Sequence, residues 1–181
     1  MATDLAQQLL RDSAVFAERA GEARHAMLAA AERRQEAILG AASQGMTVRQ
    51  IAEALGCSPA VVQHALTQAR SRRPGFDRRE ERVAWELHKA VALKLEDDRE
   101  EILAAARRNL ARLRTEKLSP FAQGWVDEWE GLLGGDIDTL ISRMLAPDER
   151  AIDMRQIGPF MGTLTQEERL VAIRKASPRA A

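Results

Sequence analysis

Residues 47–73 read TVRQIAEALGCSPAVVQHALTQARSRR, a pattern that predicts two helices separated by a sharp turn. The first helix ends at Gly56, because glycine readily adopts the left-handed backbone conformation that terminates helices. The second helix begins after Ser58, whose hydroxyl oxygen is a good N-cap, and Pro59 takes the first helical position, where no amide donor is needed. One helix therefore stops and another starts within about three residues, which leaves room only for a tight turn.

The side chains of this pair of helices divide into an apolar set and a polar set. Ala52 is small, so the two helices can cross closely. The predicted core behind the turn consists of Ile51, Leu55, Cys57, Val62 and Leu66. The other face of the second helix carries small or polar side chains: Ala60, Gln63, His64, Thr67 and Gln68. Because a helix that reads a DNA groove needs such a face, DNA recognition is the leading hypothesis.

This spacing resembles the helix-turn-helix of bacterial transcription regulators, including the LuxR type and the last domain of sigma factors. The residues that carry the resemblance are Ile51, Ala52, Gly56, Ser58, Val62 and Leu66. It covers residues 47–73, and Ala65 departs from it by being smaller than the residue often found there. The resemblance implies a DNA-binding unit of a bacterial regulator. The alternative is an ordinary helical hairpin inside an all-helical protein.

Each part of the pair receives a predicted role at double-stranded DNA. The amino end of the second helix usually meets base edges, so Gln63 is expected to pair with adenine and His64 to donate to guanine or a phosphate. The arginines that follow this helix lie where phosphates would run, although a solvated linker is the alternative. The predicted interface comprises Arg49, Gln50, Ser58, Pro59, Ala60, Gln63, His64, Thr67, Arg70, Arg72 and Arg73.

Charge and composition limit the classes of function. The formal net charge is zero, but between residues 43 and 73 four arginines oppose one acidic residue, Glu53. The positive surface is therefore local. Cys57 is the only cysteine and is expected to pack in the turn, so no disulfide and no cysteine-based zinc cluster is possible within the chain. The sequence has neither an apolar run of about 18 residues nor an apolar signal segment, which favours the cytoplasm and no membrane association.

Nothing in the pattern points to an enzyme. The three histidines, His25, His64 and His88, lack the helical spacing of a metal site, and no phosphate-binding glycine motif occurs. We therefore expect no catalytic residues, no metal and no cofactor. A helical enzyme would have to use His88.

The predicted fold is all-α: a tri-helical helix-turn-helix domain, preceded by a long N-terminal helix and followed by a helical C-terminal domain. The expected divisions are residues 1–30, 31–73 and 77–176, with Pro74 and Gly75 at the second boundary. The N-terminal helix carries an apolar stripe of Leu5, Leu9, Phe16 and Ala20. This stripe favours either a homodimer, which would span two half-sites of DNA, or a helix folded back on its own domain.

The second half resembles the C-terminal region of some actinobacterial helix-turn-helix regulators encoded beside toxins or in mobile elements. The resemblance rests on residues 85–95, 106–114, 125–133 and 158–169. It implies a repressor or autoregulator, in its sharper form an antitoxin that binds a cognate toxin through residues 77–176. The alternative function is a helical protein-interaction module that does not bind DNA. The loop of residues 157–163 is either a partner-binding loop or a turn that packs Phe160 and Met161 into the core.

Overall fold

The computed structural model describes residues 2–177, and in this part of the chain every regular element is a helix. The helices are α1 (Ala2–Ser43), α2 (Val48–Ala54), α3 (Pro59–Ser71), α4 (Arg79–Lys94), α5 (Arg99–Arg114), α6 (Pro120–Gly134), α7 (Ile137–Leu145), α8 (Glu149–Gln156) and α9 (Gln166–Lys175). The prediction of an all-α fold that contains a helix-turn-helix is confirmed. None of the described helices is both long and apolar enough to cross a membrane.

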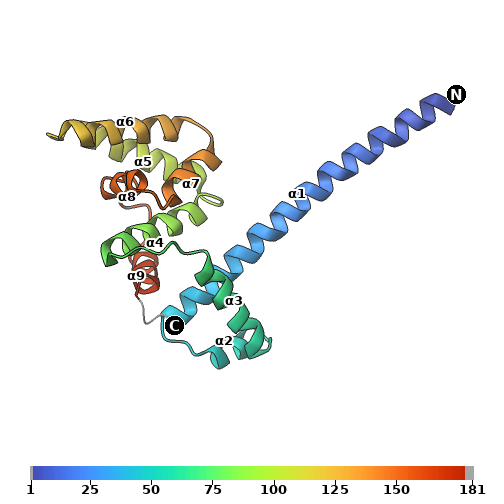
Figure 1. Cartoon of the computed structure of the whole chain (residues 1–181), viewed down its shortest axis with the longest axis horizontal. Coiled ribbons are helices and arrows are strands. Elements are labelled where there is room, and N and C mark those ends of the chain that lie inside the picture. Colours follow the sequence, from blue (N-terminus) through green and yellow to red (C-terminus); the bar gives the residue numbers. More distant parts are fainter. Residues whose placement is uncertain (1, 178–181) are drawn as a thin grey trace.

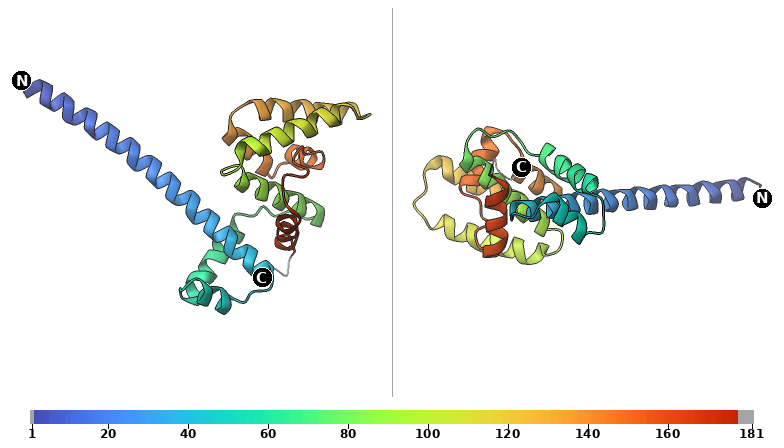
Figure 2. Two further views of the ribbon diagram at one scale, coloured as in Figure 1. Left: turned by 180° about the vertical axis from the view of Figure 1, so that it is seen from behind. Right: turned by 90° about the horizontal axis from the view of Figure 1, so that it is seen from below.

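The most prominent element is α1, a single unbroken helix that projects away from the rest of the molecule (Figure 1 and Figure 2). Gly21 does not interrupt it, because a glycine inside a helix costs only about 1 kcal/mol relative to alanine. The chain leaves the helix at Gly45, whose φ of 99° is open to glycine but unfavourable for other residues. All side chains described between residues 4 and 28 are exposed, so the helix does not fold back on its own domain.

The helix-turn-helix packs against the carboxyl end of α1. Its buried side chains are Ile38, Leu39, Ile51, Ala52, Val62, Ala65, Leu66 and Ala69, with Cys57 partly buried beside them. Leu55 was expected in this core, but it is 48% exposed. It is the C-cap of the seven-residue helix α2, one turn after Ile51 on the same side of the helix, and it lies outside the cluster of buried side chains. Ile38 and Leu39 of α1 pack beside Ala52 and complete this core without Leu55.

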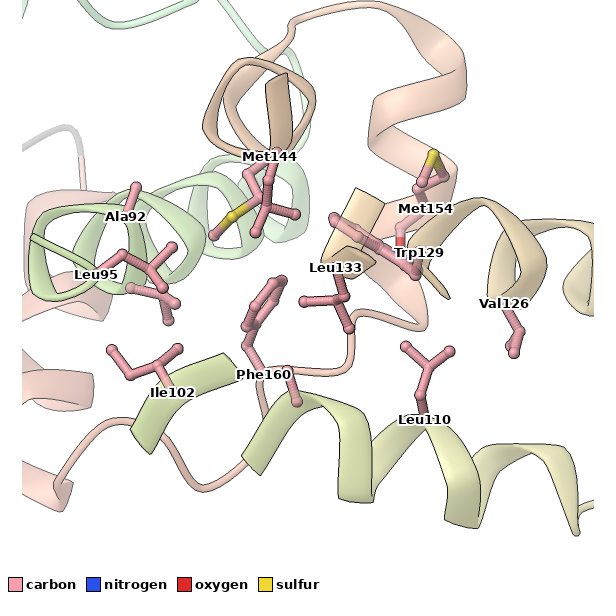
Figure 3. Close-up of a cluster of buried hydrophobic side chains, with 13 residues drawn as sticks. Ala92, Leu95, Ile102, Leu110, Val126, Trp129, Leu133, Met144, Met154 and Phe160 are labelled. Carbon is pink, nitrogen blue, oxygen red and sulfur yellow. The ribbon is translucent and has the colours of Figure 1, made fainter. Parts of the chain in front are cut away.

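Helices α4 to α8, with Phe160 of the loop before α9, form a second core (Figure 3). Its largest fully buried side chain is Trp129, whose indole nitrogen donates to the carbonyl oxygen of Met154 at 3.0 Å. The starts of α6, α7 and α9 are capped by side chains: Ser119, Asp136 and Thr165 each accept a hydrogen bond from a backbone amide of the first turn. In the loop before α9, Phe160 is buried, as the core-packing alternative requires, whereas Met161 is 65% exposed.

The last turns of α1 join the helix-turn-helix to the C-terminal helices. Arg33 forms ion pairs with Glu96 at 2.7 Å and Asp97 at 3.0 Å, and Lys89 pairs with Glu32. A β-carbon at Gly40 would sit 3.5 Å from Val171, so α9 packs closely on α1 at this point. Because α1 also supports α2 and α3, one helix contacts both the helix-turn-helix and the C-terminal helices.

Candidate nucleic-acid interface

The turn between α2 and α3 is built as the sequence predicts. Gly56 has a φ of 62°, and the amide of Cys57 donates back to the carbonyl oxygen of Ala52 at 3.0 Å. The Ser58 hydroxyl oxygen then accepts a hydrogen bond from the amide of Val61 at 3.4 Å, which caps α3. These local contacts fix the angle at which α3 leaves the turn, and hence the direction of its exposed face.

The start of α2 is held by a capping box that the sequence reasoning missed. The side-chain oxygen of Gln50 accepts from the amide of Thr47 at 2.9 Å, while the Thr47 hydroxyl accepts from the amide of Gln50 at 3.3 Å. The signal was present, since a threonine followed three residues later by glutamine is the pattern of this motif. Gln50 is exposed, but its side-chain oxygen Oε1 already accepts the hydrogen bond from Thr47. The neighbouring Arg49 is exposed on the first turn of α2.

The two faces of α3 are sharply separated. Val62, Ala65, Leu66 and Ala69 are buried against α1 and α2. The predicted base-reading residues all lie on the exposed side: Pro59, Ala60, Gln63, His64 and Thr67. The Thr67 hydroxyl donates to the carbonyl oxygen of Gln63 at 3.0 Å, one turn earlier. The fold therefore brings these five residues together on one convex helical surface.

The arginines at the carboxyl end of α3 do not behave as one group. Arg72 is exposed and its Nε lies 4.0 Å from a carboxylate oxygen of Glu32. Arg70 is half-buried on the last turn of α3. Both remain on the same end of the helix-turn-helix.

Arg73 differs from the expectation, because it is part of an internal ion cluster. Its guanidinium donates to Glu86 through Nε at 2.5 Å and to Glu36 through Nη1 at 3.0 Å and Nη2 at 2.8 Å. Lys175 also binds Glu36, at 3.1 Å. Glu36 and Glu86 are only 2% and 3% exposed, so the cluster joins α1, the end of α3, α4 and α9 inside the protein. We therefore leave Arg73 out of the candidate interface.

The two buried carboxylates of this cluster differ in their proton affinity. Burial disfavours the charged form of Glu36, but hydrogen bonds and charges from Arg73 and Lys175 outweigh burial, so its pKa is lowered. Burial also disfavours the charged form of Glu86, and here it prevails over the single hydrogen-bonded cation Arg73, so its pKa is raised. Burial favours loss of the Arg73 proton, yet the two carboxylates raise its pKa. The guanidinium is thus held as a cation by its partners.

The comparisons with known proteins locate a resemblance in this part of the chain. Residues 23–72 match a family described as Sigma-70, region 4, a range that contains the second half of α1 together with α2 and α3. No curated protein and no solved structure matches the chain. The matched range leaves out the N-terminal half of α1 and all helices from α4 onward. Residues 23–72 are therefore similar to Sigma-70, region 4, a helix-turn-helix DNA-binding domain, which supports a DNA-binding role connected with transcription.

Proposed function

We propose that the protein is a sequence-specific transcriptional regulator that places α3 in the major groove of DNA. The observation that carries the proposal is the exposed polar face of α3, on which Gln63, His64 and Thr67 lie together over an apolar underside. Arg49, Arg70 and Arg72 lie at the ends of the two helices, in position for the phosphate strands. The similarity of residues 23–72 to a DNA-binding domain supports the same assignment.

The test is selection of bound sequences from random duplex DNA at physiological salt, where specific contacts must supply the affinity. Recovery of an inverted repeat supports a dimeric regulator and identifies its operator. Recovery of no sequence preference, together with no affinity for duplex DNA, overturns the proposal. The chain would then be a helical protein-interaction module, which is the alternative function.

Base reading is assigned to Gln63. Gln63→Ala is expected to weaken binding to the selected operator by about 1–3 kcal/mol, because one amide pairing with adenine is lost. The loss on an operator with that adenine replaced should be much smaller. Gln123→Ala, an exposed glutamine on α6, is the matched control and should bind as the parent protein does. An equal loss on operator and random DNA would show that Gln63 reads no base.

Phosphate contact is assigned to Arg49 on the first turn of α2. Arg49→Ala should weaken binding to all duplexes alike and lower the slope of log affinity against log salt concentration by about 1. Arg108→Ala removes an exposed arginine from α5 and should leave the slope unchanged. The measurement is fluorescence anisotropy over a series of salt concentrations. An unaltered slope for the Arg49 variant contradicts the contact.

We further propose a homodimer formed through the projecting part of α1. At 3.6 residues per turn, Leu5, Leu9, Phe16, Ala20 and Met27 share one side of this helix. The side chains that face the C-terminal helices across a groove, among them Ala29 and Glu32, lie on the opposite side. Phe16 is 64% exposed, so a second copy can bury the stripe without displacing any described contact.

Phe16→Glu is expected to weaken dimerisation at least about tenfold, because burying a phenylalanine contributes roughly 1.5–3 kcal/mol. Operator affinity should fall with it, since one helix-turn-helix makes few base contacts. Val15→Glu is the matched control, because Val15 is exposed but lies about 100° around the helix from Phe16. Sedimentation over a concentration series distinguishes the variants. A parent protein that is monomeric both free and on DNA contradicts the dimer.

The remaining assignments rest on the sequence resemblance and on the proposed operator binding. We propose that the regulator is a repressor or autoregulator, with residues 1–30 for dimerisation, 31–73 for DNA binding and 77–176 for a partner. An antitoxin function is the sharper form of this proposal, with a cognate toxin held by residues 77–176. Co-expression with the product of a neighbouring toxin-type gene tests it, since a stable complex that binds the operator more tightly supports the antitoxin.

A further inference from the structure

A cavity of about 220 Å³ lies in the C-terminal part of the protein, between α4, α8 and the loop that precedes α9. Much of its wall is apolar and is formed by Leu87, Val91, Phe160, Met161 and Leu164. Three ionisable residues also line it: His88 and Arg155, which are buried, and Arg169 of α9, which is exposed. The cavity is separate from the helix-turn-helix and from α1, so neither the proposed DNA binding nor the proposed dimer uses it.

Arg155 is a buried cation whose hydrogen bonds are only half satisfied by the described residues. Its Nη1 donates to the carbonyl oxygens of Met144 at 3.1 Å and Ala146 at 2.7 Å, at the end of α7. Its Cζ lies 5.5 Å from the centre of the Phe76 ring, but its buried Nε and Nη2 have no hydrogen-bond partner among the described residues. Burial lowers the pKa of Arg155, and only Asp148 and Glu81 act against this, through space. Nε and Nη2 form the edge of a guanidinium that offers two parallel donors, which matches a carboxylate.

His88 offers a hydrogen-bond acceptor, whereas Arg155 offers donors. Its Nδ1 lies 2.8 Å from the carbonyl oxygen of Ala84, so Nδ1 carries the proton and Nε2 is left as an acceptor. Nε2 is buried and unpartnered within the described chain. A β-carbon at Gly158 would lie 2.6 Å from Nε2, so a glycine at this position keeps the space beside the nitrogen free. Burial, with the nearby charge of Arg155, lowers the pKa of His88 to about 4, so the ring is neutral at pH 7.

We propose that this cavity binds a small organic acid. The carboxylate accepts hydrogen bonds from Nε and Nη2 of Arg155, a hydroxyl or amide group donates to Nε2 of His88, and an apolar body packs on Phe160. Pockets for drug-sized ligands measure roughly 300–1,000 Å³, so a cavity of 220 Å³ selects a smaller molecule. The site does not depend on DNA binding. Buried water on the same nitrogens is the competing outcome of the test.

The experiment titrates the full-length, isotope-labelled protein with 4-hydroxybenzoate and follows backbone amide and arginine Nε resonances by NMR. Saturable shifts are expected at Arg155, Gly158 and the loop around Phe160. Benzoate, which lacks the hydroxyl, should bind about fivefold more weakly, because one hydrogen bond contributes on the order of 1 kcal/mol. 4-Hydroxybenzamide, which lacks the charge, should cause no saturable shift. Failure of acetate, benzoate and 4-hydroxybenzoate alike to shift these resonances up to about 10 mM would leave water as the occupant and overturn the proposal.

Two variants locate the binding without removing the buried arginine that holds α7. Gly158→Ala brings a methyl group against His88 Nε2, and Leu164→Phe enlarges a residue of the apolar wall. Both should lower the affinity for 4-hydroxybenzoate at least tenfold while keeping the helical circular-dichroism spectrum. Leu170→Phe makes the same change on α9, outside the cavity lining, and should bind normally. Unaltered affinity in both cavity variants means that the acid binds elsewhere and refutes the site.

Discussion

Arg73→Met is expected to lower the free energy of unfolding by about 3–5 kcal/mol, because removing one partner of a buried ion pair leaves the other charges uncompensated. Here the cost falls on two carboxylates at once, since Glu36 and Glu86 both take hydrogen bonds from the same guanidinium. Lys175 stays beside Glu36, so Glu86 is left with the greater deficit. Methionine keeps most of the length and the apolar contacts of the side chain. Urea denaturation at neutral pH measures the effect.

The matched control is Arg72→Met, the preceding residue. Its side chain is 33% exposed, and its one ion pair within the described residues, with Glu32, is 4.0 Å long, so a loss of no more than about 1 kcal/mol is expected. Adding Glu86→Gln to Arg73→Met should recover part of the stability, because the second change removes a buried charge that has lost its partner. If Arg73→Met proved as stable as Arg72→Met, the internal ion cluster would not stabilise the fold, and Arg73 would return to the DNA interface.

The stability of the protein should also fall steeply in mild acid because of His88. An unfolded histidine takes up a proton near pH 6.5, whereas in the folded protein burial lowers the pKa of His88 to about 4. Between these values the unfolded chain binds one proton more than the folded chain. The stabilisation is therefore complete above pH 6.5 and is lost as the pH falls to 4, at about 1.4 kcal/mol per unit and ~3 kcal/mol in all.

The measurement is the free energy of unfolding from urea denaturation at several pH values between 7 and 4. His88→Leu removes the titrating group, so its curve should be flatter than that of the parent protein by the same amount. Taking the difference between the two curves removes the contribution of the carboxylates, which also titrate in this range. Parallel curves would contradict the buried, neutral state of His88.

Much of the fold was predictable because its signals are local. Gly56, Ser58 and Thr165 each act on backbone groups within a few residues, so their roles in ending or capping helices follow from the sequence around them. The polar face of α3 was predictable for the same reason, since the spacing of Val62 and Leu66 determines which side of a helix is buried.

The errors concern contacts between distant parts of the chain. The arginines after α3 look alike in sequence, but Arg73 meets Glu36 and Glu86, which lie 37 and 13 residues away. Leu55 was assigned to the core from its apolar character, but as the C-cap of the short helix α2 it lies outside the buried cluster and is 48% exposed. The role of His88 depends on Arg155 and on a glycine in the loop before α9, and no spacing within α4 reveals either.

The continuity of α1 has a geometrical consequence. The apolar stripe and the residues that pack against α2 and α3 lie on the same continuous helix. The length of this helix sets the distance between the stripe and the helix-turn-helix, and its helical twist sets their relative azimuth. One inserted residue would rotate the stripe relative to the helix-turn-helix by about 100° around the helix axis. Seven inserted residues would lengthen the helix by about 10 Å and change this azimuth by only about 20°. The helix thus fixes both the distance and the relative azimuth of the two surfaces, and only insertions or deletions of about seven residues keep the azimuth nearly unchanged.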